Sequence, residues 1–202
     1  MTDTGKAAPT MYGPGSRALQ ESFDSTRLAN RLEERLAKDT LEDWQVAMIE
    51  NASFFFLGTS DVDGWPDVSY KGGVPGFVKI LDPSTLAFPS YDGNGMYRSV
   101  GNIMDTGKVS MLFIDFNSPG RTRIHGTAQV HLEQEWLDRF PSAEAVVEVR
   151  IGRAFPNCPR YIHNLATGEI SKNAPREGHV VEEPEWKTWP EWKEVLPGTS
   201  AD

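Results

Sequence analysis

The chain has 202 residues, a formal net charge of −9 at pH 7 and a pI near 5.0. This length is enough for one domain with a hydrophobic core, and the acidic balance argues against a nucleic-acid partner, because proteins bind a polyanion through a basic surface. No apolar run approaches membrane-spanning length, and no apolar secretory signal opens the chain. We therefore expect a soluble, cytoplasmic protein that does not enter a membrane.

The chain has one cysteine and four histidines. Cys158 cannot form an intrachain disulfide, and none of the histidines is spaced like a metal ligand, so we predict no metal site. A lone cysteine is most often a small buried side chain, which is the role expected for Cys158, whereas the nearby Arg160 would favour a reactive thiolate. The histidines are His125, His131, His163 and His179.

The first part of the chain is rich in glycine, proline, serine and threonine without a hydrophobic period, so residues 1–22 are predicted to form a flexible arm. Leu28, Leu32 and Leu36 then recur every fourth residue with charges between them, which is typical of an amphipathic helix. A second short helix is predicted from Thr40, an N-cap residue followed by an acidic residue three positions later.

From Phe54 the pattern changes to short segments rich in aromatic and β-branched residues, separated by turn sequences such as DVDGWP and GGVP. One helix, beginning near Met96, interrupts the series. Closely spaced antiparallel strands with one inserted helix predict a closed or nearly closed barrel in a mainly β (α+β) fold, rather than an open parallel sheet. The predicted strands are residues 54–60, 66–71, 76–82, 85–90, 108–116, 122–132 and 145–155.

The composition changes again in the tail, residues 165–202, where three tryptophans stand among proline and charged residues in EWKTWPEWKEVLPG. Because tryptophans rarely stay solvated, we expect this tail to pack on the barrel or on a partner subunit. The predicted organisation is therefore an arm (1–22), a barrel domain with a helical lead-in (23–164) and the tail.

The segment PDVSYK, residues 66–71, carries two polar side chains that could bind a ligand. Ser69 and Lys71 are two positions apart, so both point to the same face of the predicted strand. That face meets either a ligand or solvent, because the same alternation is found in an ordinary half-exposed sheet.

The stretch from Ser90 to Lys108, SYDGNGMYRSVGNIMDTGK, turns through two glycines directly into a helix. The unpaired backbone N–H groups of a helix start, together with Arg98 and Ser99 in its first turn, suit an anion such as a phosphate. Asn102 lies one turn further on the same side. The alternative is an ordinary surface turn with a solvated arginine.

Arg121 and Arg123 alternate in GRTRIHG just after a predicted hairpin turn, so their guanidinium groups share a face. Two like charges repel unless an anion lies near them, but two solvated arginines at a strand end are the simpler explanation. Together with the PDVSYK strand and the helix start, the two arginines form the third part of one candidate site.

The order and spacing of these segments resemble the FMN-binding split β-barrel proteins related to pyridoxamine 5'-phosphate oxidase. The resemblance covers roughly Asp39 to His163, and no single motif in it is diagnostic. It implies an antiparallel split β-barrel with flanking helices. The segments that carry it are FFFLGTSDVDGWPDVSYKGG, LAFPSYDGNGMYRSVGNI, TGKVSMLFIDF, RTRIHGTAQV and PNCPRYIH, in that order.

The same resemblance implies a homodimer with two FMN molecules in grooves between the subunits. Ser69 and Lys71 would then contact the isoalloxazine edge or the ribityl phosphate, and Arg98 and Ser99 would hold the phosphate. The residues implied as FMN contacts are Ser69, Lys71, Ser90, Tyr91, Arg98, Ser99, Asn102, Arg121, Arg123, Arg160 and Tyr161, the last two from the partner subunit.

The implied activity is that of an FMN-dependent oxidoreductase acting on a small molecule, with the flavin as the catalytic group and no acid or base side chain required. Enzymes of this family that oxidise pyridoxamine phosphate carry an arginine in a C-terminal segment, whereas EWKTWPEWKEVLPG has none, which argues against that substrate. The alternative is a barrel that holds haem, a deazaflavin or FMN without turnover. Haem would need an axial ligand, for which His125 and His163 are the candidates.

Overall fold

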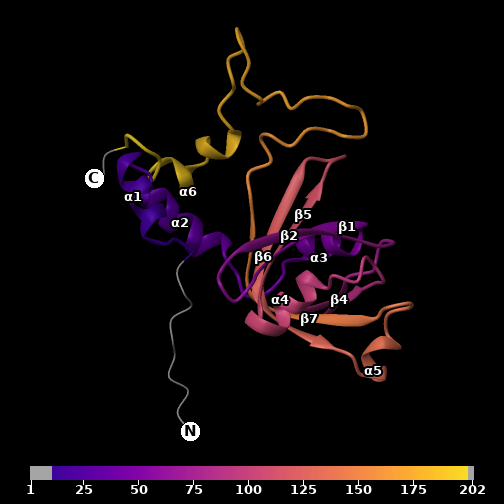
Figure 1. The fold of residues 1–202 in the computed structure, drawn as a ribbon. Coiled ribbons are helices and arrows are strands. Elements are labelled where there is room, and N and C mark those ends of the chain that lie inside the picture. The colour runs from indigo at the N-terminus through magenta and orange to yellow at the C-terminus, as the bar shows by residue number, and fades with distance from the viewer. Residues whose placement is uncertain (1–10, 200–202) are drawn as a thin grey trace. The chain divides into compact units, whose positions relative to one another are not determined.

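The computed structural model describes residues 11–199 (Figure 1), so residues 1–10 and 200–202 lie outside the described part. The chain divides into two compact units. One joins the residues up to Ala37 with those from Lys172 onward, and the other is Lys38–Ser171. This division differs from the predicted one because it groups the N-terminal helices with the C-terminal tail.

The larger unit contains a single antiparallel sheet. Its strands are β1 (Phe54–Ser60), β2 (Pro66–Gly72), β3 (Lys79–Asp82), β4 (Thr85–Ser90), β5 (Lys108–Asp115), β6 (Gly120–His131) and β7 (Ala145–Pro156). Within residues 11–199, these seven strands follow the order β2-β1-β5-β6-β7-β4-β3, so the sheet ends in the edge strands β2 and β3 and does not close. The predicted fold, a mainly β (α+β) antiparallel split barrel with flanking helices, is confirmed.

Alternation along β1 separates an inner face from an outer face. Phe55 and Leu57 are buried, whereas Phe54 is only partly covered, because successive side chains of a strand point to opposite sides. The Phe55 ring lies 5.0 Å from that of Phe88 and 5.1 Å from that of Phe113, measured between centroids. These rings join β1, β4 and β5 around one core.

A β-bulge between His125 and Gly126 interrupts the pairing of the two longest strands, β6 and β7. The carbonyl oxygen of Arg150 lies where a Cβ atom of residue 126 would stand, well inside van der Waals distance. Only glycine fits there without a shift of the backbone. The bulge lets both strands curve around the core.

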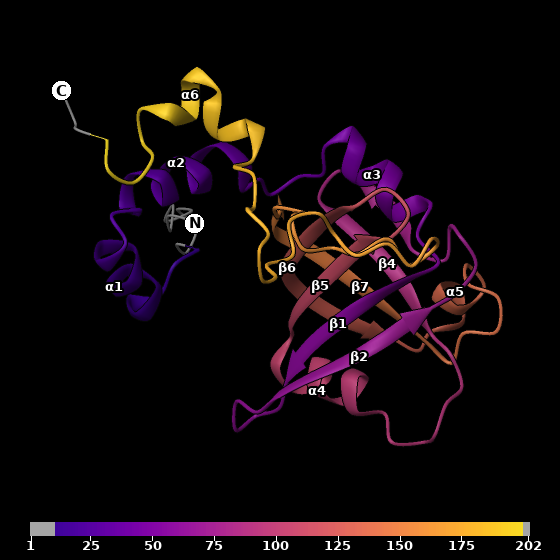
Figure 2. The ribbon, with the colours of Figure 1, turned by 90° about the horizontal axis from the view of Figure 1, so that it is seen from above.

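Three helices flank the sheet, α3 (Asp43–Glu50), α4 (Arg98–Thr106) and α5 (Gln134–Leu137). Figure 2 shows α4 beside β1 and β2, with α3 at the other end of the barrel. In α3, the buried Gln45 donates from Nε2 to Oγ1 of Thr122 at 2.7 Å, and its Oε1 accepts the backbone N–H of Glu42 at 3.1 Å. The helix is therefore capped at Glu42 rather than at Thr40, because this glutamine is anchored in the core.

The smaller unit contains the helices α1 (Pro14–Ser22) and α2 (Thr26–Leu36). Helix α2 matches the predicted amphipathic helix. Helix α1 differs from the flexible arm predicted for residues 1–22, of which 1–10 lie outside the described residues. Proline in its first turn and the helix-forming Ala18, Leu19 and Gln20 favour a helix despite the glycines around it.

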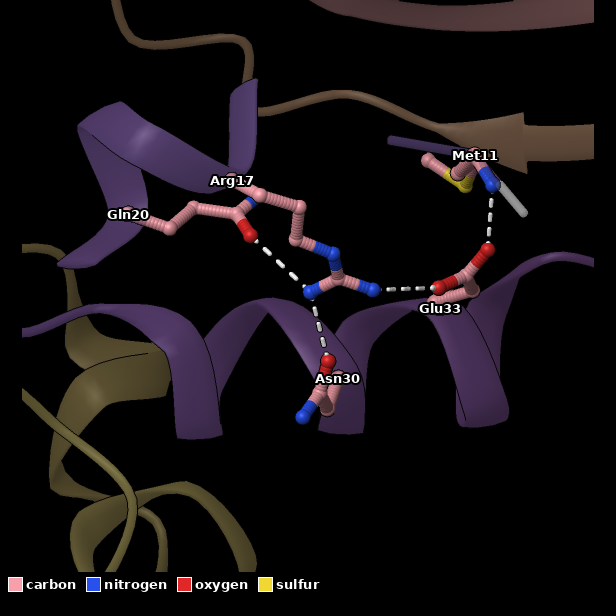
Figure 3. Close-up of polar contacts among 5 residues, drawn as sticks. All are labelled: Met11, Arg17, Gln20, Asn30 and Glu33. Atoms are coloured by element: carbon pink, nitrogen blue, oxygen red, sulfur yellow. Dashed lines mark hydrogen bonds and ion pairs between the residues drawn. The ribbon is translucent and has the colours of Figure 1, made fainter. Parts of the chain in front are cut away.

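Arg17 links α1 to α2 through polar contacts, as Figure 3 shows. Its guanidinium donates to Oε1 of Gln20 at 2.9 Å and to Oδ1 of Asn30 at 2.7 Å. It also forms an ion pair with Glu33 at 3.4 Å, and Glu33 accepts the backbone N–H of Met11. One side chain thereby ties the two helices together.

The tail forms η1 (Glu185–Thr188) and α6 (Pro190–Lys193), and it packs on α2. Arg31 of α2 forms an ion pair with Glu194 at 2.9 Å. Trp192 is buried, and its ring lies edge-on to that of Trp186 at 6.0 Å. Packing of the tail on the barrel or on a partner subunit stays a prediction.

Candidate functional site

A pocket of about 530 Å³ lies between β2, the end of β4 and the loop that leads into α4. Ligand sites commonly have volumes of about 300–1,000 Å³, so this pocket can hold a small molecule or a large part of a cofactor. The polar and charged residues in its wall, tyrosines aside, are Asp67, Ser69, Lys71, Ser90, Asp92, Asn94, Arg98 and Ser99.

One wall of the pocket is a face of β2. Ser69 and Lys71 alternate with the exposed Val68 and Tyr70, so they share a face, as the period of two predicts. This face meets the first turn of α4, where Oγ of Ser99 accepts a hydrogen bond from Nζ of Lys71 at 2.9 Å and lies 3.2 Å from Oγ of Ser69. Three polar side chains from two distant segments are thereby joined.

Lys71 is half-buried in this wall. Burial lowers the pKa of its ammonium group from the ordinary value, because a charge is less stable away from water. The negative charge of Asp67 acts in the opposite direction on this pKa. While it is protonated, Lys71 offers a partly dehydrated positive charge, which attracts an anion more strongly than a fully solvated one does.

The adjoining wall is the start of α4. Tyr97 precedes the helix in a left-handed conformation with φ 48°, and no side chain caps the helix, so the N–H groups of its first turn have no side-chain acceptor. The helix dipole adds partial positive charge at the same place. Arg98 is half exposed, and its Nε lies 3.6 Å from Oδ1 of Asp67.

The donors around this pocket fit a phosphate monoester. Such a group carries up to two negative charges and three acceptor oxygens, which a guanidinium, an ammonium, hydroxyl groups and free backbone N–H groups can satisfy together. Tyr91 and Met96 also line the pocket and provide apolar surface for the rest of a ligand. The residues present therefore suit a phosphorylated cofactor.

The structure brings together six of the eleven FMN contacts implied by the sequence and places five elsewhere. Those in the pocket wall are Ser69, Lys71, Ser90, Tyr91, Arg98 and Ser99. Those outside it are Asn102, Arg121, Arg123, Arg160 and Tyr161. The role of each of these eleven residues in binding FMN stays a prediction.

The residues outside the pocket have contacts of their own. Asn102 is buried and donates from Nδ2 to Oγ1 of Thr59 at 3.0 Å, so it ties α4 to β1. Arg121 donates to the carbonyl oxygen of Cys158 at 2.6 Å, and the guanidinium of Arg160 lies 5.5 Å from the ring centre of Tyr161. The expectation that Cys158 is buried is wrong, since it is exposed beside this arginine contact.

The histidines considered as haem ligands lie away from the pocket. His125 is on β6, and the pKa of its imidazole is lowered by partial burial and by the charges of Arg153 and Arg123. Nδ1 of His163 accepts the backbone N–H of Ser171 at 3.1 Å. Among the described residues, no histidine lines the pocket.

Among residues 11–199, no three or more histidine, cysteine, aspartate or glutamate side chains gather in a way that could hold a metal ion. No helix in the same range has the length and apolar character needed to cross a membrane.

Asp67 and Tyr97 also line the pocket, although neither was singled out in the sequence. Asp67 is two positions before Ser69, so the same alternation could have placed it on the shared face. Tyr97 lines the pocket and donates from its hydroxyl to Oε2 of Glu144 at 3.0 Å. Nothing in the local sequence indicates this contact, because it depends on the position of the chain near β7.

Comparison with known proteins bears directly on the larger unit. The family model for pyridoxamine 5'-phosphate oxidase matches residues 41–159, which is more than half of the chain. No curated protein matches the sequence. The match covers the strands, α3 and α4, and hence the whole pocket.

Several solved structures are similar to this chain. HupZ from Group A Streptococcus is 21% identical, with 64% of this chain and 98% of that chain covered and a TM-score of 0.47. A candidate pyridoxamine 5'-phosphate oxidase from Lactobacillus delbrueckii is 28% identical, with 59% and 98% covered and a TM-score of 0.49. An FMN-binding protein from Syntrophomonas wolfei is 15% identical, with 70% and 96% covered and a TM-score of 0.43.

The family match agrees with the resemblance found in the order of the strand and helix segments. It extends from the start of α3 to the segment after β7, nearly the same range as in the sequence comparison, Asp39 to His163. The chain belongs to the pyridoxamine 5'-phosphate oxidase family.

Proposed function

We propose that this protein is an FMN-dependent oxidoreductase that acts on a small molecule. The observation that carries the proposal is the joining of Lys71, Ser99 and Ser69 beside Arg98 at an uncapped helix start, in a pocket that the family match spans. FMN, when bound, supplies electron or hydride transfer, and the protein binds and orients it.

The proposed division of roles follows the two walls. Lys71, Arg98 and the first-turn N–H groups of α4 hold the phosphate, and Ser69 and Ser99 add hydroxyl contacts. Ser90 and Tyr91 line the part of the pocket at the end of β4. Pyridoxamine phosphate is not the proposed substrate, because EWKTWPEWKEVLPG lacks an arginine. A cytoplasmic location, expected from the sequence, is part of the same proposal.

A protein of this fold that holds another cofactor, or FMN without turnover, is the alternative. A deazaflavin with a phosphate suits the same donors as FMN. Haem suits them less, since no histidine among the described residues lines the pocket. The absorption spectrum of the purified protein distinguishes the three cofactors.

Titration with FMN tests the proposal. We expect saturable quenching of flavin fluorescence, with riboflavin binding more weakly because it lacks the phosphate. The purified protein should also show a flavin spectrum, or acquire one on addition of FMN. No saturable binding up to high micromolar FMN, or a Soret band in the isolated protein, would contradict the proposal.

We also propose that the functional unit is a homodimer, with Arg160 and Tyr161 of each subunit close to the flavin of the other. Support comes from the outer face of β2, where Val68 and Tyr70 are 72% and 62% exposed. Tyr70 is paired with Phe56 of β1 and stacks on Phe54, so the apolar surface continues across two strands. Exposed apolar surface of this kind is commonly an interface.

Analytical ultracentrifugation measures whether the protein is a monomer or a dimer. A dimer is expected at micromolar protein concentration with FMN present, since stable dimers bury more than about 1,200 Å² in total. Replacement of Val68 and Tyr70 by serine should shift the equilibrium toward the monomer. A wild-type protein that sediments as a monomer under these conditions would rule the dimer out.

A further inference from the structure

Asp67 is an unexpected residue in a pocket suited to a phosphate. It lies at the start of β2 on the face shared with Ser69 and Lys71, and it lines the same cavity. Its side chain is 26% exposed, and Oδ1 lies 3.6 Å from Nε of Arg98. A carboxylate here opposes the binding of an anion, so its presence needs a physical reason.

The charges around the pocket supply that reason. Lys71 and Arg98 are two cations that line one pocket, and like charges near each other destabilise a fold. Asp67 contacts Arg98, and its charge also counteracts the effect of burial on the pKa of Lys71. One carboxylate therefore offsets part of the positive charge of both side chains.

We propose that Asp67 is the internal counter-ion of this pocket and that it competes with the ligand phosphate for Arg98. The proposal rests on the proposed function, because it takes the phosphate of FMN as the anion. In the free protein, Asp67 pairs with Arg98. When the phosphate binds, Arg98 exchanges the carboxylate for it, and Asp67 then lowers the affinity for phosphorylated ligands alone.

Asp67 could instead hold Arg98 in position for the phosphate. In that case, removing the carboxylate would weaken the binding of FMN. The geometry favours competition. The separation of 3.6 Å is longer than a hydrogen bond, and Arg98 is half exposed, so the contact restrains the guanidinium only weakly. The repulsion between the carboxylate and a doubly charged phosphate remains, because both groups share one pocket.

Asp67→Asn tests the proposal, with dissociation constants for FMN and riboflavin measured by flavin fluorescence. FMN should bind about threefold to thirtyfold more tightly than in the wild type, since removing the charge removes repulsion in a partly solvated site. Riboflavin should change less than about twofold, because it carries no phosphate charge. Asp67→Glu keeps the carboxylate and should not show the tightening of FMN that Asp67→Asn shows.

Asp92→Asn is the matched control, since Asp92 lines the same pocket from an exposed loop and forms no ion pair among the residues that the structure describes. It should tighten FMN less than Asp67→Asn does. Weaker or unchanged FMN binding by Asp67→Asn overturns the proposal, and so does equal tightening of riboflavin or an equal effect of Asp92→Asn. FMN binding that is absent from both the wild type and Asp67→Asn contradicts the proposed function itself.

Discussion

Replacing Arg98 by alanine is expected to weaken FMN binding about tenfold to a hundredfold and to leave riboflavin binding nearly unchanged, because a charge-assisted contact to phosphate is lost. Arg98 stands at the uncapped start of α4, where the dipole and the free N–H groups act on the same anion. The side chain is half exposed, so its removal leaves no buried cavity and should not unfold the protein.

Four dissociation constants measure this effect, for two ligands and two proteins, together with a melting curve of each protein. Arg150→Ala is a matched control, because Arg150 is an exposed arginine of β7 that does not line the pocket. It should bind both ligands as the wild type does. If Arg98→Ala weakens riboflavin as much as FMN, Arg98 does not contact the phosphate, and the helix start is an ordinary surface turn.

The affinity for FMN relative to riboflavin is expected to fall about tenfold between pH 7 and pH 10 in the wild type, and not in Lys71→Arg. The pKa of Lys71 is lowered by burial in the free protein, and a bound phosphate raises it again. At a pH between the pKa of Lys71 in the free protein and its pKa in the complex, FMN binding requires the uptake of a proton by Lys71. The affinity for FMN therefore falls as pH rises. Because burial lowers the pKa of Lys71 in the free protein, this fall in affinity begins below the ordinary pKa of lysine.

The two ligands share the isoalloxazine ring, so titration of the ring cancels in the ratio of their affinities. The phosphate of FMN is already doubly charged at pH 7, since its second pKa is about 6. Lys71→Met should bind FMN weakly at every pH, because it has the length of lysine without its charge. A pH dependence in Lys71→Arg as large as in the wild type would exclude Lys71 as its source.

Local sequence patterns were enough to predict the strands of the barrel, to within a few residues, and the direction of the side chains along them. The predicted segments 54–60 and 85–90 coincide with β1 and β4, because aromatic and β-branched residues alternate with turn residues over a short, local range. The same local period placed Ser69 and Lys71 on one face. These features depend only on neighbours along the chain.

Which faces of these elements contact one another could be seen only in the folded chain. Ser99 lies nearly thirty residues from Lys71 along the chain, and they touch because α4 packs against β1 and β2. The packing of the tail on α2 could not be predicted from local sequence patterns either, because it joins the two ends of the sequence. Contacts between distant segments depend on strand order and helix docking, and no local period contains that information.

The same reason explains the arginines that the sequence grouped together. The resemblance implied both Arg98 and Arg121 as FMN contacts. Of the two, Arg98 lines the pocket, whereas Arg121 donates to the carbonyl oxygen of Cys158. The alternation that placed Ser69 on the pocket face also places Asp67 there. The contact of Asp67 with Arg98, however, is seen only in the structure. A pattern in one strand determines which side chains share a face, and the packing of another element against that face determines what they can bind.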